Sequence, residues 1–151
     1  MRTSRWIPTV MLTLLLAGCA SVPTAEGPID WSEANERWSI LVVTIDPDGD
    51  ERVTRIWLAL VDGEAVIRTN ESRWWANLER SPRLGVRHAG EEHVFGVEFV
   101  EERSEREEID RAFAEKYGWM EALMFPQPPG ETHAHYGRLT SPAPPAPEWP
   151  L

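Results

Sequence analysis

Short apolar segments separated by strong turn signals run through most of the chain, and they restrict its fold more than any other feature. Segments of this length, rich in β-branched and aromatic residues, are typical of β-strands. The predicted strands span residues 39–45, 53–61, 65–69, 84–88, 92–100 and 132–139. The links between them include Asp48-Gly49, Asp62-Gly63 and Ala89-Gly90. Because Asp-Gly is among the strongest hairpin signals, we expect a small antiparallel sheet.

Helical segments lie between and after these strands. The predicted helices span residues 30–37, 72–81 and 104–117, and residues 119–125 are apolar and fit either a helix or a strand. Asp30 with Glu33 and Ser104 with Glu107 resemble capping boxes, which open helices. The element order predicts an α+β protein, a small six-stranded antiparallel barrel with flanking helices.

The first residues have the order of a secretory signal peptide. Arg2 and Arg5 precede an apolar stretch over residues 7–16, and Leu16-Ala17-Gly18-Cys19 follows. These last four residues resemble a bacterial lipobox, in which the cysteine carries lipid and becomes the mature N-terminus. An ordinary helix with a buried cysteine is the alternative interpretation. Since more than one acyl chain gives stable anchoring, a lipidated Cys19 would hold the protein on a membrane.

This interpretation divides the chain into four parts and gives it a location. We expect a signal peptide over residues 1–18, a lipidated tether over 19–29, a folded domain over 30–139 and a proline-rich tail over 140–151. Ala20 follows the cysteine where, by resemblance, an Asp would favour inner-membrane retention. The expected location is therefore the bacterial cell envelope, on the periplasmic face of the outer membrane.

Composition excludes several classes of protein. The chain has 151 residues with 25 acidic and 15 basic side chains, which gives a net charge of −10. Nucleic-acid binding requires a basic surface, so a general nucleic-acid binder is excluded. One cysteine can form neither an internal disulfide nor a cysteine-based zinc site.

One stretch reverses this acidic balance. Residues 68–87 carry only two acids against five arginines, which are Arg68, Arg73, Arg80, Arg83 and Arg87. Arginine grips phosphate in a bidentate manner, and a helix N-terminus adds free N–H groups, so a strand-to-helix junction here is a candidate anion site. The alternative is that these arginines pair with the abundant glutamates on a solvated face.

Two short motifs in this stretch carry a family resemblance. Residues 68–73 (Arg-Thr-Asn-Glu-Ser-Arg) resemble the phosphate-binding segment of the pyridoxamine-phosphate-oxidase-like split barrels, where a strand ends in Thr-Asn and Ser-Arg-Lys opens a helix. Residues 74–78 (Trp-Trp-Ala-Asn-Leu) with Pro82 resemble a helix of the deazaflavin-dependent nitroreductase-like group. The hairpin over residues 44–57 is similar to the opening of the same superfamily, and the resemblance covers residues of about 30 to 120.

The resemblance implies a six-stranded split barrel, usually a homodimer, that binds FMN, a deazaflavin or sometimes haem between subunits. By position, the cofactor phosphate would be held by Arg68, Thr69, Ser72 and Arg73. Arg55 and Trp57 would approach its ring, and Asn70 and Trp74 complete the candidate site. In such proteins the cofactor supplies the hydride chemistry, and the protein binds and orients it.

Other aromatic and imidazole side chains have less specific interpretations. Trp57, Trp74 and Trp75 could stack on a ring, although large aromatic residues more often pack in a core or an interface. Trp31, Trp38 and Trp119 are interpreted as packing residues. His133 and His135 share one face of a strand, but no carboxylate-rich motif completes a site, so we predict no metal.

Two functions remain open from the sequence. The first is a lipid-anchored envelope protein whose split barrel binds a flavin or deazaflavin, either as an oxidoreductase acting on a small molecule or as a former enzyme. The second is a non-catalytic lipoprotein that serves as a binding or interaction module.

Overall fold

A computed structural model describes residues 21–25, 27–141 and 143–145, and in this part of the chain it has four helices and seven strands. The helices are α1 (Trp31–Glu36), α2 (Arg73–Arg80), α3 (Arg103–Tyr117) and α4 (Trp119–Met124). The strands are β1 (Ile40–Ile45), β2 (Glu51–Ile56), β3 (Leu58–Val61), β4 (Glu64–Thr69), β5 (Arg83–His88), β6 (Glu91–Phe99) and β7 (His135–Thr140). The predicted α+β class is confirmed, whereas the predicted number of six strands is wrong.

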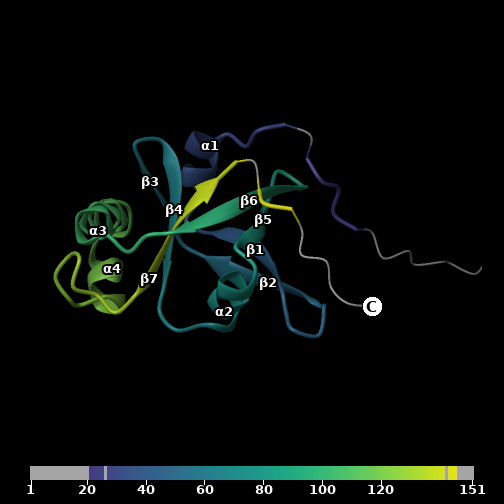
Figure 1. The fold of residues 1–151 in the computed structure, drawn as a ribbon. Coiled ribbons are helices and arrows are strands. Elements are labelled where there is room, and N and C mark those ends of the chain that lie inside the picture. The colour runs from purple at the N-terminus through teal and green to yellow at the C-terminus, as the bar shows by residue number, and fades with distance from the viewer. Residues whose placement is uncertain (1–20, 26, 142, 146–151) are drawn as a thin grey trace, which may run out of the picture.

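The additional strand arises at Trp57, where the segment predicted as one strand divides in two. β2 pairs with β1, and β3 pairs with β4. All pairs in the sheet are antiparallel, in the order β2-β1-β5-β6-β7-β4-β3. The two edge strands are thus consecutive in the chain and only one residue apart. The sheet must therefore curl until its two edges meet at Trp57 (Figure 1).

Two of the predicted hairpins turn as expected. β3 and β4 are joined at Asp62 and Gly63, with φ of 52° and 81°, and β5 and β6 are joined at Ala89 and Gly90, with φ of 51° and 86°. Two successive positive φ angles are the geometry that matches the twist of a two-residue hairpin. Ala89 is the unusual member, because residues other than Gly, Asn and Asp rarely adopt a positive φ.

The predicted helix starts have different outcomes. The side chain of Asp30 caps α1 by accepting hydrogen bonds from the N–H groups of Ser32 and Glu33. The predicted start at Ser104 is wrong, since α3 already begins at Arg103, and Glu102 at its N-cap makes no side-chain cap. The ambiguous segment after Gly118 forms helix α4. Within the segment predicted as the sixth strand, the strand itself begins at His135.

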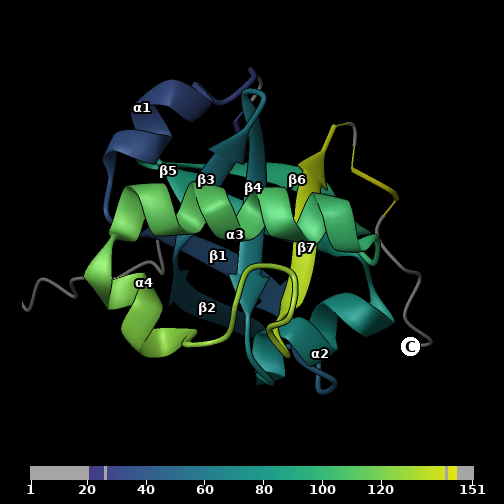
Figure 2. The same ribbon diagram turned by 90° about the vertical axis from the view of Figure 1, so that its left-hand side faces the viewer.

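The core has two parts, one on each face of the curled sheet. Inside the curl, α2 contributes Trp74, Trp75 and Leu78 to a cluster with residues of β1, β5 and β6. On the other face, α3 lies across β3, β4 and β7 (Figure 2) and packs Ile109 and Phe113 against the sheet. This second cluster forms one side of the candidate site.

Part of the predicted tether contacts the sheet. Pro23 and Ala25 exchange backbone hydrogen bonds with Glu92 at 2.9 and 3.0 Å, and Ile29 is buried. The predicted signal peptide and Cys19 lie outside the described residues, as do residues 146–151 of the tail. Within the described part of the chain, no helix has both the length and the apolar character needed to cross a membrane.

Candidate functional site

One pocket, of about 330 Å³, contains most of the residues predicted as the cofactor site. We call it the Trp57 pocket. Six of the eight predicted residues line it, which are Arg55, Trp57, Arg68, Thr69, Asn70 and Trp74. The remaining lining residues are Ile56, Met124 and Phe125, the last two from the end of α4. The break between β2 and β3, the end of β4 and the first turn of α2 therefore meet at one place.

Ser72 is absent from this lining because its side chain caps α2. Its Oγ accepts a hydrogen bond from the N–H of Trp75 at 3.4 Å and lies 3.4 Å from the hydroxyl of Thr69. The helix start predicted at Ser72 is confirmed. The backbone N–H of Trp75, one of the free N–H groups at the start of α2, therefore bonds to a side chain of the protein itself.

Arg73 also lies outside the lining, with 72% of its side chain exposed. Its guanidinium contacts the carboxylate of Asp46 at 3.3 Å. Asp46 accepts further hydrogen bonds from Arg52, at 2.8 and 2.6 Å, and from the amide of Asn77, at 2.8 Å. These donors, Arg52 first and Asn77 second, hold the pKa of Asp46 well below its ordinary value.

Arg68 is buried, and its guanidinium is held by two carboxylates. It donates hydrogen bonds to Asp110 on α3 and, at 2.6 Å, to Glu121 on α4. The guanidinium also lies over the rings of Phe125 and Phe113, 3.9 and 4.7 Å from their centroids. Its Nε–H has no hydrogen-bond partner among the described residues. A buried donor without a partner is uncommon, so this N–H is a candidate contact for a ligand.

Asp110 connects Arg68 to the rest of the buried polar network. It accepts hydrogen bonds from the hydroxyl of Tyr136, at 2.9 and 3.0 Å, and from the N–H of Gly130, at 2.7 Å. Burial raises the pKa of Tyr136. No sequence motif predicts a role for Asp110 or Glu121 at this site. One signal was present, because Asp110 lies next to Ile109 and three residues before Phe113, on the apolar face of its helix.

Aromatic stacking fixes the break in the sheet beside the pocket. The rings of Trp57 and Tyr117 stack at 4.3 Å with an interplanar angle of 8°. The Tyr117 hydroxyl donates to the C=O of Leu58 at 2.8 Å and accepts from its N–H at 3.0 Å. Burial raises the pKa of Tyr117 to about 12. On the open side of the pocket, the exposed Arg55 donates to Ser39 Oγ at 3.1 Å.

The arginine-rich stretch is thus divided among several partners. Arg87 pairs with Glu92 and Glu51, which agrees with the alternative interpretation that these arginines pair with glutamates. Arg80 and Arg83 donate to the backbone carbonyls of Ile45 and Pro144. Of the five arginines, Arg68 is the one that lines the Trp57 pocket.

The remaining aromatic and imidazole predictions are partly confirmed. Trp74 and Trp75 are buried as core residues, whereas Trp119 is 74% exposed and Trp38 51% exposed, so the packing role predicted for Trp119 is wrong. His135 stacks on Trp75 with 5.3 Å between centroids. Among the described residues, no cluster of three or more His, Cys, Asp or Glu has the arrangement of a metal site.

Comparison with known proteins identifies the fold. No family model and no curated protein matches the chain. Its structure is similar to that of HutZ, the haem storage protein of Vibrio cholerae, with 16% identity over 73% of this chain and 86% of that chain and a TM-score of 0.57. A protein related to general stress protein 26, of the pyridoxinephosphate oxidase family, from Clostridium acetobutylicum matches with 15% identity, 72% and 81% coverage and a TM-score of 0.53.

The F420-H2 dependent reductase FDR-A gives 15% identity, 68% and 94% coverage and a TM-score of 0.51. These structure neighbours are split-barrel proteins. The chain has a split-barrel fold. In this split barrel the Trp57 pocket lies where β2 and β3, the two edges of the sheet, meet.

Proposed function

We propose that the Trp57 pocket binds a flavin or a deazaflavin and that the protein is an oxidoreductase that uses this cofactor. The observation that carries the proposal is that six residues chosen from sequence as cofactor contacts line a single pocket. The named activities of the reductase FDR-A and of the pyridoxinephosphate oxidase family give it further support.

The lining of the pocket fits a planar ring with an anionic tail. Its volume of about 330 Å³ lies within the range of ligand pockets, roughly 300–1,000 Å³. Trp57, Trp74 and Phe125 offer apolar surface for the ring. The unpartnered Nε–H of Arg68 would donate to an acceptor on the cofactor, and the exposed Arg55 would hold its anionic group.

The cofactor, when bound, supplies the hydride chemistry. The protein's own residues would bind and orient the ring and exclude water from one side of it. Asp110 and Glu121 hold the Arg68 side chain in place, so its Nε–H is positioned before a ligand arrives. Because Ser72 and Arg73 lie outside the lining, Arg55 would hold the anionic group of the cofactor in place of Arg73.

The proposal is tested by thermal unfolding of the full chain with FMN, F420 or haem added separately. A ligand at one hundred times its dissociation constant stabilises a protein by about 2.7 kcal/mol. We expect FMN or F420 to raise the unfolding temperature. Arg55→Ala should weaken the binding of that cofactor by about 1.5–3 kcal/mol, the scale of a hydrogen bond to a charged group. The control is Arg111→Ala, an exposed arginine on α3 outside the pocket, which should leave binding unchanged.

Haem is the competing outcome of this experiment. Haem iron takes His, Cys, Met or Tyr as an axial ligand, and the Trp57 pocket offers only Met124 among its lining residues. His135 lines a neighbouring pocket of about 420 Å³ together with Trp75 and Phe99. Stabilisation by haem alone, abolished in His135→Ala, would contradict flavin binding and assign the cofactor to that second pocket.

A second copy of the chain is the partner we propose for α4. Trp119 and Leu123 are 74% and 71% exposed, and the adjacent Met124 lines the Trp57 pocket. An apolar surface of this kind beside a ligand pocket is typical of an interface. Sedimentation equilibrium should show a dimer that Leu123→Lys dissociates, whereas Ala114→Lys on the exposed side of α3 should not. A monomeric parent protein would contradict the proposal.

If no cofactor binds, the same exposed surface supports the alternative function, a non-catalytic interaction module. Crosslinking in intact membranes distinguishes the two functions. An interaction module should be captured with a different protein, whereas the enzyme should be captured with itself.

We further propose that the protein is anchored by lipid on Cys19 in the bacterial envelope. The support is the sequence Leu16-Ala17-Gly18-Cys19 after an apolar segment. Metabolic labelling with palmitate in a bacterial host should label the parent chain and not Cys19→Ser. An unlabelled parent chain that fractionates with the soluble proteins would contradict the anchor.

A further inference from the structure

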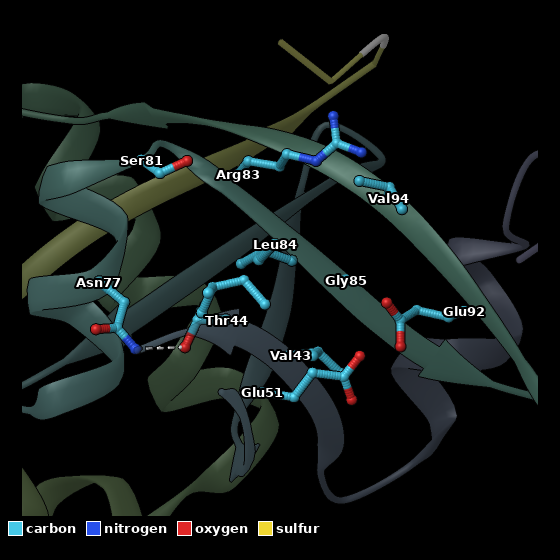
Figure 3. Close-up of a pocket in the computed structure, with 11 residues that line it drawn as sticks. Val43, Thr44, Glu51, Asn77, Ser81, Arg83, Leu84, Gly85, Glu92 and Val94 are labelled. Carbon is cyan, nitrogen blue, oxygen red and sulfur yellow. Dashed lines mark hydrogen bonds between the residues drawn. The ribbon is translucent and has the colours of Figure 1, made fainter. Parts of the chain in front are cut away.

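A third, smaller pocket lies on the outer face of β1, β5 and β6, and the proposed function does not use it. We call it the Gly85 pocket; its volume is about 160 Å³. Figure 3 shows Val43, Gly85 and Val94 on neighbouring strands, with Glu51 and Glu92 on one side and Asn77 on the other. The pocket therefore combines an apolar floor with a polar rim.

Residue 85 is glycine, and its lack of a side chain makes room for the Glu92 side chain, which lies over it at one end of the floor. Gly85 is the register partner of both Val43 and Val94, so these three residues share one face of the sheet. A Cβ atom at position 85 would lie 2.6 Å from a carboxylate oxygen of Glu92. Ile45, at the edge of the same pocket, remains 37% exposed. The outer face thus presents apolar side chains that no described segment covers completely.

The chain that follows β7 turns back over this face. The C=O of Pro144 accepts a hydrogen bond from Arg83 at 2.6 Å, and Arg83 lines the Gly85 pocket. Pro144 also lies against Gly96, where a Cβ atom would come within 2.9 Å of its Cδ. Gly96 is the register partner of Thr140 on one side and of Arg83 on the other. The segment over residues 143–145 therefore crosses β6 and reaches the rim of the pocket.

We propose that the tail continues in this direction and places the side chain of Trp149 in the Gly85 pocket of its own chain. A polyproline II segment rises about 3.1 Å per residue, so five residues beyond Pro144 span about 15 Å. Two strand spacings, from β6 to β1, amount to about 10 Å. The tail is long enough to cross the pocket.

The chemistry of the pocket fits this occupant. Val43, Ile45 and Val94 offer apolar contact to the indole ring. The indole N–H needs an acceptor when the ring is buried, and the carboxylates of Glu51 and Glu92 line the same pocket. The prolines at 144, 145, 147 and 150 restrict the free tail, so docking costs less conformational entropy than it would for a flexible segment.

The test uses the full chain labelled with 5-fluorotryptophan and observed by ¹⁹F NMR. Trp149→Phe identifies the resonance of Trp149 among the eight tryptophans. We expect this resonance to be displaced from its position in a synthetic peptide of residues 143–151. Ile45→Lys should return it to the peptide position. The matched control is Val53→Lys, another exposed residue on the same face that does not line the pocket, and it should leave the resonance displaced.

Three results would overturn the proposal. The first is a parent resonance at the peptide position. The second is a displaced resonance that Ile45→Lys does not move. The third is a displacement that disappears on dilution, which would assign the contact to the tail of another copy. If Ile45→Lys does not fold, Arg83→Ala removes the contact with Pro144 and replaces it as the test variant.

Discussion

The buried guanidinium of Arg68 donates to the carboxylate of Glu121 at 2.6 Å and thereby joins β4 to α4 beside the Trp57 pocket. Asp110 holds the same guanidinium from α3. A residue predicted from sequence as a phosphate contact is therefore also the charged centre of the packing between the sheet and two helices. Its remaining Nε–H is the part we assign to the ligand.

Arg68→Met should destabilise the fold strongly. The change leaves Asp110 and Glu121 buried without their cation, and breaking a buried ion pair in this way costs about 3–5 kcal/mol. The free energy of unfolding in urea measures the loss. Arg111→Met is the control, because its pair with Glu107 is exposed and should contribute less than about 0.5 kcal/mol. Equal effects of the two variants would contradict the structure.

Tyr117→Phe should destabilise the fold through Leu58. The tyrosine hydroxyl is bonded to both the N–H and the C=O of Leu58, at the point where the sheet breaks. Removing it leaves the N–H without that acceptor, at a cost of about 1–3 kcal/mol. Urea unfolding measures the change, with Trp119→Phe as the exposed aromatic control. A loss no larger than that of the control would show that Leu58 does not depend on Tyr117.

Asp46 should make stability fall in acid. Its pKa in the folded protein lies below the unfolded value of about 3.9, so it stabilises the fold above that pH and loses this effect as the pH falls further. Asp46→Asn removes the charge at every pH. The difference in unfolding free energy between the parent protein and Asp46→Asn should therefore narrow below about pH 4. A constant difference from pH 7 to pH 2 would contradict this role.

Lys116 should make stability rise with pH in the alkaline range. Burial lowers its pKa to about 8, whereas in the unfolded chain it is about 10.4. Between these values the unfolded chain binds more protons, so this group makes stability rise with pH. Lys116→Met should reduce the change in unfolding free energy between pH 8 and 10. Above pH 10 the raised pKa of Tyr117 acts in the other direction, so the comparison stays below that pH. If the unfolding free energy of Lys116→Met rises as much as that of the parent protein, Lys116 is not the source of the rise.

Local sequence patterns predicted the parts of the structure that depend on local chemistry. The turn at Asp62-Gly63, the cap at Asp30 and the helix start at Ser72 depend on neighbouring residues, and the structure confirms them. The break at Trp57 could not be predicted in this way, because residues 53–61 form one continuous strand-like pattern. It becomes necessary only when the sheet curls and its two edges meet.

The candidate site shows the same limit. Arg68, Thr69 and Asn70 are adjacent in the chain, so one motif was sufficient to find them. Asp110 and Glu121 lie 42 and 53 residues beyond Arg68, and only the packing of α3 and α4 on the sheet brings them to it. The same packing places Met124 and Phe125 in the pocket, where no motif predicted them.

A crystal structure of the protein with the cofactor that stabilises it tests the central proposal most directly. We predict a flavin or deazaflavin ring against Trp57 and Trp74, with an acceptor of the cofactor within hydrogen-bond distance of Arg68 Nε. A cofactor bound instead between Trp75 and His135, or a Trp57 pocket left empty at saturating cofactor, would contradict it.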